Sequence, residues 1–190
     1  NIKFNGKNYF KKISDEKFIY YPNKRIQRIL INYEAHLERF MHSYNLDSIK
    51  FTDGDVVVDC GANVGELNLA LKSKKIHVKY IAFEPDLSTY ECCILNNESD
   101  KENIHNVALS TNNDEKEFYQ DSFGGNSSLV DFGESDKIKV KTMKLDDFKI
   151  KKIKLLKIDA EGYEPEVLSG SIETLKTTEL VAVDFGPERG

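Results

Sequence analysis

The sequence lacks three features, and each absence excludes a class of protein. Cysteine is the first, because the chain has only Cys60, Cys92 and Cys93, too few for a disulfide framework. Cys92 and Cys93 are adjacent in a helical pattern, so their side chains point in different directions. We expect all three thiols to be buried as small hydrophobic groups. A reducing cytoplasm is the natural setting for such a chain.

Long apolar runs and positive net charge are the other two features. No apolar run approaches the ~18 residues of a transmembrane helix. The first residues lack the apolar segment and small-residue cleavage site of a signal peptide. The net charge of −5 argues against a general nucleic-acid binder, which is normally basic. We therefore expect a cytoplasmic protein with no transmembrane segment and no nucleic-acid partner.

Lysine is locally concentrated between Lys137 and Lys157 despite the acidic balance of the whole chain. The segment reads KIKVKTMKLDDFKIKKIKLLK, with lysines alternating with apolar residues. This alternation predicts a strand pair with solvated lysines on one face. A binding site for a polyanion is the alternative.

Residues 1–50 predict an N-terminal cap of short strands followed by one long helix. Residues 1–22 contain β-like pieces and an Asn-Gly hairpin signal. His36 and His42 lie on the helix, at its surface or partly packed. The helix has one apolar face, with residues three and four positions apart: Ile26, Ile29, Leu30, Tyr33, Leu37, Phe40 and Tyr44.

Residues 51–190 predict a single α/β domain in which apolar strands alternate with helices. Continuous apolar strands separated by helices indicate a parallel sheet covered on both faces. We expect a Rossmann-like, doubly wound, mostly parallel sheet with a β-rich insertion at about 112–148. The run SFGGNSS within that insertion predicts a hairpin loop or a mobile lip over the site. The segments expected to form the five strands of the main sheet are VVVDC, VKYIAFEP, IHNVALS, IKLLKIDAEG and ELVAVDFG.

A glycine-containing turn, DCGANVGE, follows the first of these strands. Ligands of doubly wound sheets bind at the carboxyl ends of the strands, so this turn is a candidate site. The dinucleotide pattern G-x-G-x-x-G is not met, because Asn63 replaces the second glycine and Glu66 stands in the place of the third. Asp59 and Glu66 would repel a phosphate. A ligand with an ammonium group, a ribose and no phosphate fits better, and S-adenosylmethionine (SAM) is such a ligand. Its amino group can pair with Asp59, directly or through water.

An acidic residue, Glu84, follows the second strand in the segment IAFEPD. An ionised carboxylate there can accept both ribose hydroxyls. NAD sites use an acidic residue at the same place, so Glu84 indicates a nucleoside without identifying it. The alternative is that Glu84, Pro85 and Asp86 only end the strand and cap the next helix.

These motifs together resemble the FkbM-type SAM-dependent methyltransferases, a family of class I methyltransferases. The resemblance runs from Val56 to Asp184 and implies a seven-stranded Rossmann-like sheet. It also implies methyl transfer from SAM to a hydroxyl of a small-molecule acceptor, such as a sugar, lipid or secondary metabolite. The motifs that carry it are VVVDCGANVG, AFEPD, NVALS, GGNSSL, LDDF and LLKIDAEGYEPEVLSG.

The resemblance also implies which residues bind the cofactor. Asn106 to Ala108 match the end of the third strand, where adenine is expected. The sequence departs from the family at Asp184, where many relatives have Glu. A class I sheet has two further strands after this point, so the resemblance predicts an incomplete C-terminal part. The implied cofactor-binding residues are Asp59, Gly61, Ala62, Asn63, Gly65, Glu84, Pro85 and Ala108.

A second acidic cluster, Asp159 and Glu161, follows the fourth strand in KIDAEGYE. These residues are the predicted catalytic pair, because a hydroxyl acceptor gains from a base that removes its proton. They can instead line the pocket passively. A third possibility is that they hold a divalent ion together with Asp184, although no metal site is predicted. His105 is a further residue that can approach the site.

Two other functions stay open on the sequence. One is a non-catalytic nucleoside-binding domain of the same fold, which would need Asp59 and Glu84 but not the second acidic cluster. The other is an NAD-dependent oxidoreductase, against which the altered glycine pattern speaks. Nothing in the charge or aromatic pattern selects an acceptor or an oligomeric state.

Overall fold

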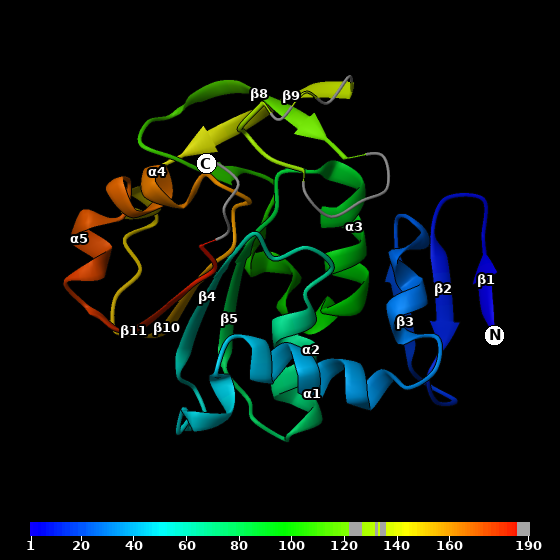
Figure 1. Cartoon of the computed structure of the whole chain (residues 1–190). Coiled ribbons are helices and arrows are strands. Elements are labelled where there is room, and N and C mark those ends of the chain that lie inside the picture. The colour runs from blue at the N-terminus through cyan, green and yellow to red at the C-terminus, as the bar shows by residue number, and fades with distance from the viewer. Residues whose placement is uncertain (122–126, 132, 134–135, 186–190) are drawn as a thin grey trace.

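A five-stranded parallel sheet forms the centre of the computed structural model, which describes residues 1–121, 127–131, 133 and 136–185 (Figure 1). The spatial order is β6-β5-β4-β10-β11. Counted along the chain, this order is 3-2-1-4-5, which is the arrangement of Rossmann-like doubly wound sheets. The predicted α/β fold class is therefore confirmed. The strands are β4 (Val56–Cys60), β5 (Lys79–Phe83), β6 (Ile104–His105), β10 (Ile153–Ile158) and β11 (Thr178–Val183).

Helices cover both faces of this sheet. Successive side chains of a strand point to opposite faces, so Val57 and Val58 of β4 belong to two different core clusters. The cluster of Val57 includes residues of α1 (Tyr33–Ser43), α2 (Glu66–Ser73) and α3 (Leu87–Asn96). The cluster of Val58 includes residues of η4 (Leu145–Phe148), α4 (Glu164–Ser169) and α5 (Ile172–Leu175).

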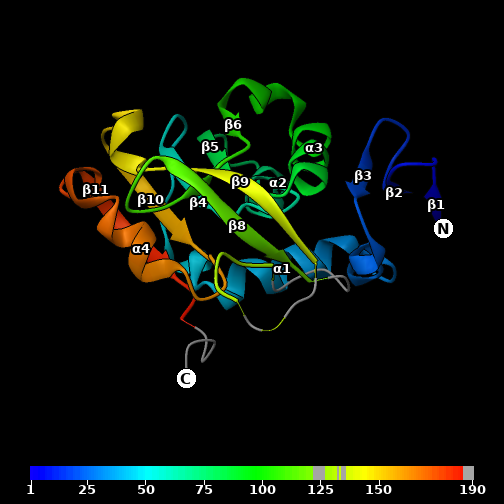
Figure 2. The same cartoon turned by 90° about the horizontal axis from the view of Figure 1, so that it is seen from above.

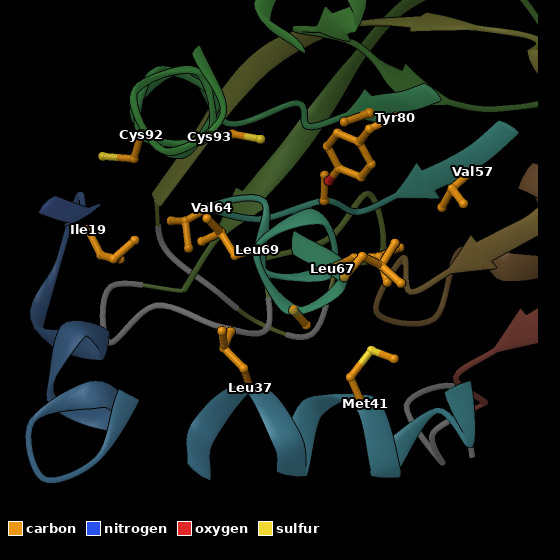
Figure 3. Packing of buried hydrophobic residues seen from close by; sticks show 14 of the residues in the cluster. Ile19, Leu37, Met41, Val57, Val64, Leu67, Leu69, Tyr80, Cys92 and Cys93 are labelled. Carbon is orange, nitrogen blue, oxygen red and sulfur yellow. The ribbon is translucent and has the colours of Figure 1, made fainter. Parts of the chain in front are cut away.

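The N-terminal cap consists of a small sheet followed by helical segments. Strands β1 (Ile2–Phe4), β2 (Tyr9–Lys12) and β3 (Phe18–Tyr21) form an antiparallel sheet. The short 3-10 helices η1 (Lys24–Ile29) and η2 (Leu46–Ser48) flank α1. From α1, Leu37 and Met41 point toward α2 (Figure 3), and both are about 1% exposed. The cap therefore shares its core with the main domain.

The single long helix predicted from Ile26 to Tyr44 is wrong in one respect, because the structure divides it. Asn32 lies between η1 and α1, and its side chain accepts a hydrogen bond from the backbone N–H of Ala35. An asparagine that binds the backbone in this way begins a helix rather than continuing one. Ile31, just before it, is 96% exposed.

A second three-stranded sheet, of order β7-β9-β8, lies above the main sheet in Figure 1 and crosses over it in Figure 2. It contains β7 (Ala108–Leu109), β8 (Asp114–Gln120) and β9 (Asp136–Met143). The strand predicted at 104–110 is divided between the two sheets, since β6 pairs with β5 and β7 pairs with β9. The segment SSLV, within the expected β-rich insertion, contributes an isolated bridge between Ser128 and Tyr119. Most of the SFGGNSS run lies outside the described residues.

The segment Lys137–Lys157 contains two strands, and the predicted exposed lysines are found in β9 at Lys137, Lys139 and Lys141, but the prediction that the two strands pair with each other is wrong. The first part of the segment is β9, which pairs with β8, and the last part is β10 of the main sheet, with the 3-10 helix η4 between them. Lys157 is also not solvated, since it is only 2% exposed. The prediction that the three cysteines are buried is confirmed. Within the described residues, no helix combines the length and the apolar character needed to cross a bilayer.

Candidate functional site

A cavity of about 830 Å³ lies at the carboxyl ends of β4, β5 and β10, beside η1, α1 and β8. Its size is within the range of small-molecule sites. Eight of the ten predicted site residues line it, whereas Asp59 and Gly65 lie outside the wall that the described residues form. The eight are Gly61, Ala62, Asn63, Glu84, Pro85, Ala108, Asp159 and Glu161. Their roles in binding and catalysis stay predictions.

The turn after β4 is shaped by glycines with little space around them. Gly61 has φ +71°, and a Cβ there would lie 1.8 Å from the backbone oxygen of Asp159. Gly61 thus lets the ends of β4 and β10 approach each other closely. Gly65 begins α2 with φ +82°, and its Cβ would lie 2.1 Å from Nδ2 of Asn97. Gly65 therefore serves the packing of α2 against α3.

Glu84 is held at the cavity by two backbone N–H groups. Asn63 donates to its Oε2 and Asp86 to its Oε1, both at 2.9 Å. The side chain is nearly buried, and burial raises the pKa of Glu84 to about 8, although both N–H groups act to lower it. Each carboxylate oxygen has more than one acceptor position. Glu84 can therefore accept further hydrogen bonds from a ligand.

Asp86, two residues after Glu84, caps α3. Its Oδ1 accepts from the backbone N–H and the hydroxyl of Thr89, at 2.8 and 2.7 Å, and its Oδ2 accepts from Gln120 of β8. Burial alone would raise the pKa of Asp86, but the hydrogen bonds from Ser88 and Thr89 lower it below its usual value. Of the two interpretations of this motif, the helix cap is made by Asp86. Glu84 lines the cavity, where the nucleoside-binding interpretation needs it.

One part of the cavity wall is apolar. The segment after β6 contributes to it, and Asn106 fixes that segment by donating from Nδ2 to the backbone oxygens of Glu84 and Pro85, both at 2.9 Å. Two further residues of this wall come from β8 and the segment that follows it. The apolar residues are Phe83, Val107, Ala108, Leu109, Phe118 and Leu129.

A buried ion pair between Asp59 and Lys157 lies behind the turn. Lys157 donates from Nζ to Asp59 Oδ1 at 3.0 Å and to the backbone oxygen of Gly61 at 3.1 Å. The hydroxyl of Tyr80 donates to Asp59 Oδ2 at 2.7 Å. Burial by itself lowers the pKa of Lys157, but Asp59 and Asp159 outweigh it and raise that pKa overall. Asp59 is about 1% exposed and is not part of the described cavity wall, so the structure gives it no direct access to a ligand there.

Sequence reasoning missed Lys157, because a lysine among lysines is normally solvated. One signal was present. In the segment LLKI, Lys157 has apolar neighbours on both sides, and it lies two residues before Asp159. In a strand buried on both faces, a lysine requires a buried partner.

Asp159 connects the acidic cluster to the N-terminal cap. The hydroxyl of Tyr44, at the end of α1, donates to Asp159 Oδ2, and Lys157 Nζ lies 3.8 Å from the same oxygen. Burial and the neighbouring Asp159 raise the pKa of Tyr44, so its hydroxyl stays a donor. Tyr44 was predicted only as part of the apolar helix face.

Glu161 lies in a tight turn with unusual backbone angles. Glu161 has φ 50° and Gly162 has φ 92°, both in the left-handed region. For a non-glycine residue this conformation costs about 1 kcal/mol. Glu164 stabilises the turn, because its Oε1 accepts from the N–H groups of Ala160 and Gly162 at 2.8 and 3.1 Å. Ser128 donates to the backbone oxygen of Glu161 at 2.7 Å. Sequence reasoning did not assign this role to Glu164.

Glu66, at the start of α2, connects that helix to the N-terminal cap. Its Oε1 accepts from the hydroxyl of Tyr21 at 2.6 Å and lies 2.5 Å from Nε2 of His36. Burial alone would raise the pKa of Glu66, but the bonds from His36 and Tyr21 lower it. His36 lines the cavity. His105 does not line it, since its ring packs 5.2 and 5.0 Å from the rings of Phe83 and Phe148.

The metal interpretation of the second acidic cluster gains no support. Among the residues that the structure describes, no group of three or more His, Cys, Asp or Glu side chains is arranged to hold a metal ion.

Comparisons with known proteins give a family and several solved structures. A family model described as the methyltransferase FkbM domain matches residues 59–185. One of these structures is the crystal structure of a protein from Pyrococcus horikoshii assigned as an RNA methyltransferase. It is 16% identical, with a TM-score of 0.35, and the similarity covers 83% of this chain and 62% of that one. A comparison with curated proteins gives no match.

Proposed function

We propose a function from the premise that the chain belongs to the FkbM methyltransferase family. The proposed activity is SAM-dependent methylation of a hydroxyl oxygen on a small-molecule acceptor, such as a sugar, a lipid headgroup or a secondary metabolite. SAM, when bound, supplies a methyl group attached to a positively charged sulfur. The residues of this chain bind and orient the two reactants and receive the proton of the acceptor.

The single observation that carries the cofactor proposal is the position of Glu84. Its two carboxylate oxygens are oriented by the N–H groups of Asn63 and Asp86 at the wall of the cavity. A ribose has two adjacent hydroxyls, which match an acceptor pair of this kind. The apolar wall around Ala108 and Phe118 fits a flat base such as adenine. The residues therefore fit a nucleoside.

The charges behind the turn fit a cationic cofactor. Asp59, Lys157 and Asp159 together carry a formal charge of −1, and only Asp159 of the two acids lines the cavity. We assign Asp59 an indirect role, in which it holds Lys157 in place. Asp159, whose side chain is 24% exposed, is then the carboxylate that faces a positively charged ligand.

The catalytic roles are divided between the two predicted residues. Asp159 already binds Tyr44 and lies close to Lys157, so we assign it to orientation. Glu161 lines the same cavity and is presented by a turn whose unfavourable backbone angles Glu164 stabilises. Strained backbone that the surroundings maintain is characteristic of functional sites. We assign Glu161 as the base that accepts the hydroxyl proton.

Calorimetric titration with S-adenosylhomocysteine, the demethylated cofactor, tests the cofactor proposal. We expect saturable binding by the wild-type protein and about tenfold weaker binding by Glu84→Gln, since a hydrogen bond to a charged group is lost. Glu102→Gln is the matched control, because Glu102 is exposed and outside the cavity wall, and it should bind like wild type. Absence of binding by folded wild-type protein, or equal binding by Glu84→Gln, would refute the proposal.

A further inference from the structure

Arginine is rare in this chain, and it is concentrated at the cavity. Of the 27 Lys and Arg residues only four are arginine. Three of them, Arg25, Arg28 and Arg39, line the cavity, and the fourth, Arg189, lies outside the described residues. Lys157 is the one lysine in the described wall, and it is paired with acids. We call Arg25, Arg28 and Arg39 the arginine cluster.

The arginine cluster has no direct ion-pair partner in the part of the chain that the structure describes. Across the described residues, none of the three guanidinium groups forms an ion pair within 4.0 Å or a side-chain hydrogen bond. The nearby carboxylate of Glu66 is already bonded to Tyr21 and His36. Within the cluster, the charges of Arg25 and Arg28 repel each other. An incoming anion would relieve this repulsion.

The lack of an ion-pair partner is least favourable for Arg25, because Arg25 is half-buried while Arg28 and Arg39 are exposed. Burial and then the neighbouring Arg28 lower the pKa of Arg25, whereas Glu66 and Glu161 raise it. Taking a cation out of water without a partner is unfavourable. Arg25 lines the same cavity as Glu161, to which we assign the role of base.

The type of residue points to the type of ligand. The guanidinium group is a planar fork of N–H donors that matches a carboxylate or phosphate group in two parallel hydrogen bonds. Most positively charged residues of the chain are lysines, but those that line the cavity are mainly arginines. All three arginines belong to the cap, on η1 and α1, rather than to the turns that surround Glu84.

We propose that the methyl acceptor carries an oxyanion, a carboxylate or a phosphate ester, and that the arginine cluster binds it. This inference rests on the proposed function, since it takes the region beside Glu161 as the acceptor site. SAM has one carboxylate of its own, but three unpaired guanidinium groups exceed what a single carboxylate requires. Titration of anions into protein already saturated with S-adenosylhomocysteine separates an anion of the acceptor from the carboxylate of the cofactor.

The test compares Arg28→Gln/Arg39→Gln with wild type by calorimetry at low ionic strength, where screening is weak. Inorganic phosphate and acetate are titrated separately into protein saturated with S-adenosylhomocysteine, as probes for a phosphate ester and a carboxylate. We expect at least one of them to bind wild type about tenfold more tightly than the double variant, with unchanged affinity for S-adenosylhomocysteine. Lys101→Gln/Lys151→Gln removes the same charge from exposed positions outside the wall and should behave like wild type.

Three outcomes would overturn the inference. The first is equal binding of both anions by wild type and Arg28→Gln/Arg39→Gln. The second is an equal loss in Lys101→Gln/Lys151→Gln, which would indicate a general charge effect. The third is weaker binding of S-adenosylhomocysteine by the arginine variant with anion binding unchanged, which would assign the cluster to the cofactor. Failure of the proposed function looks different, because wild type would then not bind S-adenosylhomocysteine at all.

Discussion

At the scale of the residue, the site depends on carboxylates that are held by defined donors. Glu84 is oriented by two N–H groups, Asp59 by Lys157 and Tyr80, and Asp159 by Tyr44. Each of these acids has a different set of partners, so each has a different capacity to bind a ligand. Two measurements separate these roles.

Cofactor affinity should depend on pH through Glu84. Its pKa is raised by burial to about 8, so the carboxyl is mostly protonated at pH 7 in the absence of ligand. The ribose hydroxyls donate to the ionised form, so binding should release a proton. We expect the Kd of S-adenosylhomocysteine to fall about tenfold from pH 6 to pH 7 and to level off above pH 8. Calorimetry across this range checks the trend, and Glu84→Gln should remove it. A flat wild-type profile would contradict it.

Removing one partner of the buried Asp59–Lys157 ion pair should destabilise the protein more than removing the charges of both partners. Lys157→Met leaves a buried carboxylate without its cation, so we expect a loss of about 3–5 kcal/mol in the free energy of unfolding. The double variant Asp59→Asn/Lys157→Met should recover a large part of that loss. Urea unfolding measures both.

Lys154 provides a control on the same strand. It pairs with Glu179, whose side chain is 62% exposed, and exposed ion pairs contribute less than about 1 kcal/mol. Lys154→Met should therefore have a small effect. If Lys157→Met were no more destabilising than Lys154→Met, the buried pair would not have the role assigned to it.

At the scale of the element, the cap helix α1 connects packing to the site. One face of α1 packs on α2 through Leu37 and Met41 (Figure 3), while His36, Arg39 and Phe40 line the cavity. The cap is therefore a wall of the site and not only a cover for the sheet. A change in how α1 packs should alter both stability and binding.

Leu37→Ala tests the packing of the cap. Leu37 is 1% exposed within the main core cluster, so its truncation should lower the free energy of unfolding by about 2–4 kcal/mol. Glu38→Ala, at an exposed position of the same helix, should change it by less than about 0.5 kcal/mol. Thermal or urea unfolding measures the difference. Similar values for the two variants would mean that the cap is not packed as described.

The sequence predicted elements better than their ends. The apolar period identified the cap helix, but it did not reveal that Asn32 would end one helical segment and begin the next. The third strand was likewise predicted as one piece, whereas Asn106 separates β6 from β7 by binding the backbone after β5. In both places a polar side chain competes with regular backbone pairing, and the apolar pattern alone does not record that competition.

At the scale of the whole molecule, the sheet order brings separate parts of the chain to one edge. β4, β5 and β10 are neighbours in the sheet although β10 lies far along the chain, so Gly61, Glu84 and Asp159 meet at one cavity. The sequence could predict this meeting because parallel strands end at the same edge. It could not predict the role of Lys157, which depends on burial, or that of the arginine cluster, which depends on the lack of a direct ion-pair partner among the described residues.

A crystal structure with S-adenosylhomocysteine bound tests the central claim most directly, namely that Glu84 and the turn at Gly61–Asn63 hold the nucleoside of the cofactor. The account predicts both ribose hydroxyls within about 3.2 Å of the carboxylate oxygens of Glu84, with adenine against Ala108. A ligand bound elsewhere, or one whose ribose makes no contact with Glu84, would contradict it.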